Sequence, residues 1–380
     1  MFERTKKFCD SFLDLGVPGF DLAVYKDGEC LLRHTNGYSD VDNKIKMNGK
    51  ERYNIYSCSK VITCVAAMQL WEKGLFSLDD KLSDYMPEFE KMTVKTKDGI
   101  KDAEKPILIR HLFEMTAGFS YDCNSPSLKQ ARVETDGKCQ TREAMKYLAK
   151  EPLNFTPGDR WAYSLCHDVI AALVEVLSGQ TFHEYVKQNI FTPLGMNDST
   201  FMLPEEEIES IAQQYRFENG KAVNVGKHIV KYKIGSEYAS GGAGGISTVD
   251  DYIKFLEALR VGDKILKKET VSLMATDRLT EHQKRTYWTK DTHGYGLGIR
   301  CPKGDGINLD FGWGGAACSY LAVDRENSIS LFFGAHLLSS PAQGLRSKLY
   351  RFVRAELVDN GEFEKLYSEL NELYNYNLTY

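Results

Sequence analysis

The sequence of 380 residues predicts an α/β fold in which both chain ends form one lobe, an antiparallel sheet flanked by helices. Strand-like segments occur near the N-terminus and again in the last third of the chain, and the stretch between them is rich in helical patterns. We therefore expect residues 1–75 and 235–380 to form an α/β lobe and residues 76–234 to form an inserted all-helical lobe. The active site is expected between the two lobes.

The N-terminal part of the chain has the pattern of a β-hairpin. Phe20–Tyr25 is strand-like, Lys26-Asp27-Gly28 is a turn sequence, and Cys30–His34 is expected to form the second, antiparallel strand. A polar, strand-like segment, Tyr53–Tyr56, then gives way to an apolar helical pattern that Gly74 can end.

The middle of the chain carries a series of helical patterns with recognisable ends. They are Leu82–Met86 before Pro87, Arg110–Met115 before Thr116-Ala117-Gly118, Arg142–Lys150 with Thr141 as cap, His167–Leu177 before Ser178-Gly179, and Phe182–Phe191 before Pro193-Leu194-Gly195. This succession predicts the helical insertion.

From about Tyr238 the chain returns to mixed patterns. A glycine-rich run comes first, and strands and helices alternate after it. The predicted elements are a helix over Asp250–Leu259, strands over Tyr295–Ile299, Ser319–Val323 and Ser328–Phe333, and closing helices over Leu345–Leu357 and Phe363–Tyr374.

Composition excludes several classes of protein. The net charge is -5 and no basic stripe is present, so we expect no nucleic-acid partner. No segment approaches the roughly 20 apolar residues of a membrane span, and Met1–Lys7 runs into polar sequence without an apolar leader. We expect no membrane partner and a cytoplasmic location.

Cysteine spacing argues against disulfides and zinc. The chain has 9 cysteines, an odd number, with no C-x-x-C pair. We expect reduced thiols, several of them in apolar stretches.

Ser57-Cys58-Ser59-Lys60 lies where the strand-like segment meets the helical pattern. Ser57 would stand at the helix N-terminus with Lys60 one turn further on, facing the same way. A serine hydroxyl becomes a nucleophile when a base takes its proton, and a lysine is such a base only in its neutral form. Free backbone N–H groups at the helix N-terminus can bind an oxyanion. Alone, the pattern also fits a capping serine and a surface lysine.

Tyr163 follows a turn, Phe155–Asp159, and precedes an apolar helix that starts near His167. A phenolic oxygen held near a lysine ammonium can shuttle protons. A buried core tyrosine with one hydrogen bond is the alternative interpretation.

Gly312-Trp313-Gly314-Gly315-Ala316-Ala317 precedes the strand Ser319–Val323. Glycines at a strand edge let a substrate backbone approach and can leave N–H groups unpaired. A bulge or a tight turn explains the same pattern.

In this order and spacing, the three features resemble the serine β-lactamase-like hydrolases of the class C type. That family includes penicillin-binding D-peptidases, family VIII carboxylesterases and acyltransferases, and the motifs resemble the family VIII carboxylesterases most. The resemblance covers nearly the whole chain and implies a β-lactamase/transpeptidase-like fold. Its further carriers are Ile109–Phe113 with Thr116–Phe119, Phe155-x-Pro157-Gly158, Glu175-x-x-Ser178-Gly179, Pro193–Met196, and Gly241–Gly244 with Ser247-Thr248.

The resemblance implies a role for each matching position. Ser57 is the acylated nucleophile, Lys60 accepts or relays its proton, and Tyr163 protonates the leaving group and later activates water. The oxyanion hole would use the backbone N–H groups of Ser57 and Ala316. No metal or organic cofactor is implied.

Two departures from the family pattern bear on the substrate. In family lactamases the tyrosine opens a Y-x-N motif, and the position of its asparagine is Leu165 in this chain. The third motif of those enzymes begins with Lys or His, whereas this chain has Trp313 followed by Gly314 and Gly315. Losing a charge-assisted contact to a substrate carboxylate costs about 1.5–3 kcal/mol, or about ten- to a hundredfold in binding. Leu165 and Trp313 instead favour an apolar acyl or aryl group.

We therefore expect a serine hydrolase that forms an acyl-enzyme on small hydrophobic carboxylic esters, as an esterase or an acyltransferase. One alternative is a D-amino-acid peptidase, amidase or weak β-lactamase on the same scaffold. Another is a penicillin-binding or sensor protein that acylates without turnover. The substrate is a small-molecule ester or amide, and the oligomeric state stays open.

Several other residues admit two interpretations. Tyr121, Tyr287, Trp288 and Tyr295 can line an aromatic acyl pocket or belong to the core. His111 and His167 suggest a Ser-His pair, although their helical patterns favour structural roles. The run Gly241–Gly245 lacks the sequence of a phosphate-binding loop.

Overall fold

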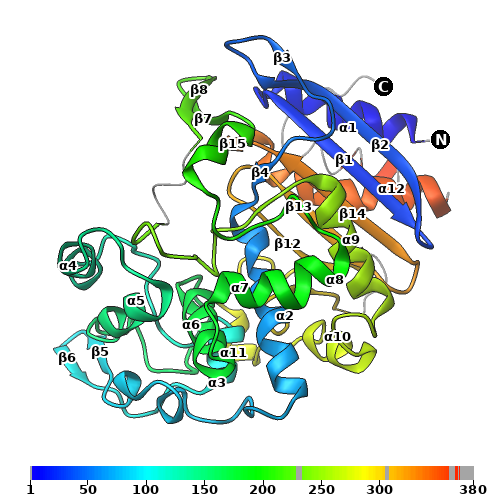
Figure 1. Cartoon of the computed structure of the whole chain (residues 1–380). Helices are drawn as coiled ribbons and strands as arrows, with labels where there is room; N and C mark the ends of the chain where they lie inside the picture. The colour runs from blue at the N-terminus through cyan, green and yellow to red at the C-terminus, as the bar shows by residue number, and fades with distance from the viewer. Residues whose placement is uncertain (1, 228–232, 304–307, 359–363, 367, 369–380) are drawn as a thin grey trace.

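The computed structural model describes residues 2–227, 233–303, 308–358, 364–366 and 368. Its largest sheet has 8 strands in the order β10-β11-β12-β13-β14-β1-β2-β3 (Figure 1). Every neighbouring pair is antiparallel. The strands are β1 (Gly19–Lys26), β2 (Glu29–Asp40), β3 (Ile45–Lys46), β10 (Gly294–Tyr295), β11 (Arg300–Cys301), β12 (Phe311–Gly314), β13 (Tyr320–Asp324) and β14 (Ile329–Ala335). The predicted antiparallel sheet, built from both chain ends, is confirmed.

The central strands β1 and β14 are buried on both faces. Successive side chains alternate between two apolar cores, so Ala23 and its partner Phe332 contribute to one core. Leu22 and its partner Phe333 contribute to the other. Burial on both faces explains why these segments are apolar at nearly every position.

Helices cover both faces of this sheet (Figure 1). On one face, α1 (Glu3–Asp14) packs against α12 (Leu349–Val358), and the rings of Phe8 and Phe352 stack with centroids 4.3 Å apart. On the other face, α9 (Val249–Val261) contacts β1, β13 and β14. The two ends of the chain thus share one core.

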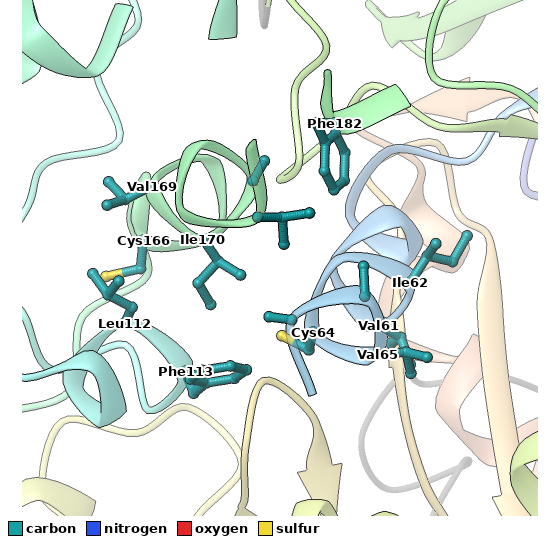
Figure 2. Packing of buried hydrophobic residues seen from close by; sticks show 14 of the residues in the cluster. Val61, Ile62, Cys64, Val65, Leu112, Phe113, Cys166, Val169, Ile170 and Phe182 are labelled. Carbon is teal, nitrogen blue, oxygen red and sulfur yellow. The ribbon is translucent and has the colours of Figure 1, made fainter. Parts of the chain in front are cut away.

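Helix α2 (Ser59–Glu72) is buried on almost every side, as expected for a helix that is apolar around its whole circumference. Figure 2 shows how it packs against α3 (Ile109–Phe113), α6 (Cys166–Ser178) and α7 (Phe182–Val186). The labelled residues of this core are Val61, Ile62, Cys64, Val65, Leu112, Phe113, Cys166, Val169, Ile170 and Phe182. Because α2 is enclosed by its neighbours, its N-terminus is held in a fixed position.

The remaining elements are short. The other α-helices are α4 (Pro126–Glu134), α5 (Thr141–Leu148), α8 (Thr192–Leu194), α10 (Lys268–Met274) and α11 (Glu281–Lys284). One-turn and π segments are η1 (Tyr56–Cys58), η2 (Leu82–Asp84), η3 (Pro87–Phe89), η4 (Lys187–Phe191), η5 (Glu205–Ser210), η6 (Pro341–Gly344) and η7 (Arg346–Lys348).

The segment expected to be all-helical also contains two hairpins, which is a correction to the sequence prediction. They are β5 (Thr93–Thr96) with β6 (Gly99–Asp102), and β7 (Gln214–Glu218) with β8 (Lys221–Gly226). The second turns through Asn219 and Gly220, which both have positive φ, as a two-residue hairpin turn requires. β7 also pairs in parallel with β15 (Leu337–Leu338), from the C-terminal part of the chain.

Two helical details differ from the predictions. The helix expected over Leu82–Met86 is only the single turn η2. Thr141 is the first residue of α5 instead of its cap, and its Oγ1 donates to the Ala239 carbonyl at 3.0 Å. The helix predicted over Phe363–Tyr374 lies largely outside the described residues.

In the described part of the chain, no helix is long and apolar enough to cross a membrane. All 9 cysteines lie in described segments and none is paired in a disulfide, and 8 of them are buried.

Candidate active site

Ser57 lies between helix α2 and the small two-stranded sheet of β4 (Tyr53–Asn54) and β9 (Ile246–Ser247). β4 pairs with β9, and η1 and α2 follow β4 directly. Tyr56 makes the bend with φ of 47°, a left-handed conformation that costs a side-chain-bearing residue about 1–2 kcal/mol. Its hydroxyl anchors the bend by donating to Gln214 Oε1 at 3.0 Å. Ser57 is therefore held at the N-terminal end of α2.

The side chains of Ser57, Lys60 and Tyr163 meet at one point. Tyr163 Oη donates to Ser57 Oγ at 2.6 Å, and Lys60 Nζ donates to the same oxygen at 3.3 Å. The Lys60 ammonium also lies 4.6 Å from the centre of the Tyr163 ring. A serine hydroxyl thus contacts two groups able to exchange its proton, as nucleophilic catalysis by serine requires.

Lys60 is fully buried and held from two further directions. Its Nζ donates to the Gly242 carbonyl at 2.6 Å and to Tyr121 Oη at 3.3 Å. The structure therefore brings Tyr121, a predicted substrate-binding residue, against the lysine. The glycine-rich run Gly241–Gly245 packs closely against α2, since the Gly245 N–H also donates to Ser59 Oγ at 2.9 Å.

Aromatic rings surround Tyr163, which immediately precedes α6. Trp313 lies nearly parallel to it, with 16° between the planes and centroids 6.0 Å apart. Trp288 and Tyr121 approach its ring to 4.9 and 5.1 Å. Trp288 is 64% exposed, so its ring forms an apolar surface open to solvent beside the reacting groups.

The other predicted aromatic residues belong to the core. Tyr287 is 3% exposed and Tyr295 is fully buried, and both pack against the buried Trp161. Trp161 in turn contacts Trp288 at 4.8 Å. Tyr287 and Tyr295 therefore pack against Trp161, which in turn contacts the exposed ring of Trp288.

The two N–H groups predicted to bind an oxyanion lie on neighbouring segments. A side chain on Gly315 would collide with the Ile55 carbonyl, so β12 and the residues after it run directly beside η1. Among the described residues, the N–H groups of Ser57 and Ala316 donate to no other group. Both are therefore available to a substrate oxygen.

Arg346 lies beneath the Trp313-Gly314-Gly315 segment. Its guanidinium donates to the Gly315 carbonyl, and a side chain on Gly314 would meet Arg346 Nη2 at 2.5 Å. The third motif lacks its own cation but has one within contact distance. Because Trp313 and Gly314 are successive residues of β12, a side chain on Gly314 would point to the opposite face from Trp313, so Arg346 lies away from the face that carries Tyr163.

Three residues do not join the site. Leu165 is 1% exposed and packs in the main core, so it offers almost no surface to a substrate, and the predicted contact is not supported. His111 accepts a bond from Leu108 N–H at 3.1 Å, and burial lowers its pKa to about 4. Burial likewise lowers the pKa of His167 well below its usual value. Neither imidazole hydrogen-bonds to Ser57 within the described chain, which is consistent with structural roles.

Sequence reasoning assigned no role at or next to this site to three residues: Asp168, Gly242 and Arg346. A local signal existed for Asp168, an acidic residue in the first turn of an apolar helix. The contacts of the other two depend on long-range packing.

Three comparisons place the chain among known proteins. The family model described as Beta-lactamase matches residues 5–353. Esterase EstB of Burkholderia gladioli is 28% identical over 276 residues, covering 67% of this chain and 69% of its own.

Two solved structures share the fold. EstCE1, a hydrolase with promiscuous acyltransferase activity, has a TM-score of 0.75 at 22% identity and covers 92% of this chain and 98% of its own. The D-amino acid amidase from Ochrobactrum anthropi has a TM-score of 0.71 at 20% identity and covers 93% of this chain and 98% of its own. The chain belongs to the beta-lactamase family, and its likeness to EstB supports a serine hydrolase of that family.

Proposed function

We propose that this protein hydrolyses or transfers the acyl group of small hydrophobic carboxylic esters through an acyl-enzyme on Ser57. The observation that carries the proposal is the 2.6 Å contact between Tyr163 Oη and Ser57 Oγ, with Lys60 Nζ 3.3 Å from the same oxygen. A nucleophile in direct contact with two proton-transfer groups is arranged for acyl transfer.

Acylation begins when Ser57 Oγ attacks the ester carbonyl and the Lys60–Tyr163 pair takes its proton. The carbonyl oxygen becomes an oxyanion, which the N–H groups of Ser57 and Ala316 bind. The ester C–O bond then breaks, and Tyr163 returns the proton to the departing alcohol. The acyl group is left on Ser57.

Deacylation is the reverse with a new nucleophile. Water or an alcohol gives its proton to Tyr163 as its oxygen attacks the acyl carbon, and Ser57 recovers the proton as it leaves. Hydrolysis and acyl transfer therefore differ only in which acceptor enters the site.

The surroundings of Tyr163 support an ester with an apolar alcohol or acyl group. Trp313, Trp288 and Tyr121 surround the point where the leaving group receives its proton. Aromatic side chains bind flat apolar groups because the contact buries apolar surface and allows the rings to stack. EstB is named an esterase and EstCE1 a hydrolase with promiscuous acyltransferase activity, which agrees with the proposed type of reaction.

The test is turnover of p-nitrophenyl butyrate by the wild type and by Ser57→Ala. We expect nitrophenol well beyond one equivalent from the wild type and a loss of at least about a thousandfold in Ser57→Ala. Ser11→Ala, in α1 on the far side of the sheet, is the matched control and should keep full activity. No turnover by the wild type, or full activity in Ser57→Ala, would refute the proposal.

The second candidate is a D-amino-acid peptidase, an amidase or a weak β-lactamase. The fold neighbour named as a D-amino acid amidase agrees with it. Release of D-alanine from a D-alanyl peptide faster than hydrolysis of the ester would favour this candidate. A stable penicilloyl adduct without turnover would instead indicate a penicillin-binding or sensor protein.

A further inference from the structure

Asp168 is a buried carboxylate that the reaction scheme above does not use. It lies in the first turn of α6, five positions after Tyr163, and is 1% exposed. Its Oδ1 accepts hydrogen bonds from Tyr238 Oη at 2.7 Å, Ser240 Oγ at 2.7 Å and Gly242 N–H at 3.4 Å. An oxygen that accepts three donors is in the environment of an ionised carboxylate. Burying such a group costs several kcal/mol before its partners compensate, so its position requires an explanation.

Gly242 joins this carboxylate to the catalytic lysine. Its N–H donates to Asp168 and its carbonyl accepts the 2.6 Å bond from Lys60 Nζ. A side-chain carbon at Gly242 would lie 2.5 Å from Asp168 Oδ2 and 3.3 Å from Lys60 Nζ. The backbone of Gly242 is not left-handed, so the glycine is required for space. The Asp168 carboxyl and the Lys60 side chain therefore both lie within contact of the position that a Gly242 side chain would occupy.

The thiols and the imidazole that face Lys60 carry no charge near neutral pH. Burial raises the pKa of Cys58 and Cys166 to about 11 and that of Cys123 to about 12. It raises the pKa of Cys64 well above the usual value and lowers that of His167 well below it. The remaining neighbours are the hydroxyls of Ser57, Tyr121 and Tyr163. Of these described neighbours, Asp168 alone is a carboxylate.

We propose that Asp168 is a positioning residue that fixes the Ser240–Gly242 loop and keeps Lys60 in its ammonium form. A charged Lys60 cannot accept the Ser57 proton. It stabilises the phenolate that forms when the Tyr163 hydroxyl releases its proton to solvent, and this phenolate is the base. The Ser57 proton passes to Tyr163 Oη as the Oγ–acyl bond forms, and from Tyr163 to the alkoxide as the ester C–O bond breaks. The ester form of this scheme depends on the proposed function, but the charge of Lys60 does not.

The first variant is Asp168→Asn, which keeps the size of the side chain and removes its charge. Tyr238→Phe is the matched control, because it removes one hydrogen bond to the same carboxylate and leaves the charge. We measure the rate at which a fluorophosphonate labels Ser57 between pH 5 and 10, together with kcat and KM for p-nitrophenyl butyrate. Labelling reports activation of Ser57 whatever the natural substrate is.

For Asp168→Asn we expect the basic limb of the pH profile to move to lower pH by about one unit or more, because Lys60 loses its proton more easily. We also expect kcat to fall by about tenfold with little change in KM, since a group that acts on proton transfer affects the chemical step. Tyr238→Phe should leave the limb in place. A folded Asp168→Asn protein whose profile superimposes on that of the wild type would overturn the proposal.

Gly242→Ala gives a second test if Asp168→Asn does not fold. Its methyl group would separate Asp168 from Lys60 without removing either, so the limb should move in the same direction. An unchanged limb in Gly242→Ala would also overturn the proposal. Absence of ester turnover in the wild type with normal labelling would refute the proposed function alone.

Discussion

The hydroxyl of Tyr163 lies 2.6 Å from Oγ of Ser57, although the two residues come from different parts of the fold. Ser57 precedes α2 at the edge of the sheet lobe, and Tyr163 precedes α6 in the helical segment. Both sit just before a helix N-terminus, and α2 and α6 pack against each other. Helix packing in the core therefore sets the distance between the nucleophile and its proton carrier.

Removal of the Tyr163 hydroxyl should abolish most of the activity. In Tyr163→Phe the ring contacts with Trp313 and Trp288 remain, and only the bond to Ser57 is lost. We expect kcat for p-nitrophenyl butyrate to fall by about a hundredfold to ten-thousandfold with a small change in KM. Steady-state kinetics checks this. A Tyr163→Phe enzyme with wild-type kcat would exclude Tyr163 from proton transfer.

A cation at position 313 should change the substrate preference. Trp313→Lys removes the ring that lies parallel to Tyr163 and adds a charge near Arg346. We expect kcat/KM to fall by about three- to tenfold for a neutral butyrate ester, and binding of carboxylate-bearing esters to improve by about tenfold. The ratio of kcat/KM for the neutral ester to kcat/KM for the carboxylate-bearing ester, measured in one protein preparation, serves as an internal control. An unchanged ratio would show that this position does not select the substrate.

The exposed ring of Trp288 should contribute to binding of flat apolar esters. In Trp288→Ala we expect kcat/KM to fall by about three- to tenfold for phenyl butyrate and by less for methyl butyrate, since ring contacts contribute about 0.5–1.5 kcal/mol. Val133→Ala, which is also highly exposed but is not packed against the aromatic residues around Tyr163, is the control and should change neither rate. Equal losses for both esters would mean that Trp288 acts on folding or chemistry instead.

Stability should fall as the pH rises from about 4 to about 7 because of Asp21 in β1. Burial raises the pKa of Asp21 to about 7 despite its 2.6 Å contact with Arg33 Nη2, and its Oδ1 has no partner among the described residues. The unfolded carboxyl titrates near its ordinary value, so the folded state binds more protons across this range.

Asp21→Asn should remove this dependence and raise the free energy of unfolding at pH 8 by roughly 4 kcal/mol. Arg33 keeps its 2.9 Å ion pair with Asp250, so the variant leaves no isolated cation. Urea unfolding at pH 5 and pH 8 checks both statements. A wild type more stable at pH 8 than at pH 5, with no effect of Asp21→Asn, would contradict them.

Sequence patterns predicted the elements whose burial imposes a clear period. The first hairpin, α6, α9 and the strands β13 and β14 all follow their apolar patterns. The hairpin β5–β6 was missed because most of its residues are exposed, and the hairpin β7–β8 because only the first two residues of β7 are buried, so neither carries such a pattern. The Asn219-Gly220 turn was the available signal for the second hairpin.

Some residues of the candidate site could likewise be predicted from the sequence, and others could not. Ser57 and Lys60 stand one turn apart on one helix, so a local motif is enough to pair them. Gly242 and Asp168 reach Lys60 through contacts between segments that are far apart in the chain, and Arg346 reaches Gly315 in the same manner. Leu165 shows the opposite error, since its place next to the tyrosine motif suggested a substrate contact although its side chain turns into the core.

The most direct test of the account is the mass of the intact protein after brief exposure to p-nitrophenyl butyrate and an acid quench. We predict a butyryl adduct that peptide mapping assigns to Ser57, absent from Ser57→Ala, together with nitrophenol released beyond one equivalent. An adduct on another residue, or turnover that persists in Ser57→Ala, would contradict acyl transfer through Ser57.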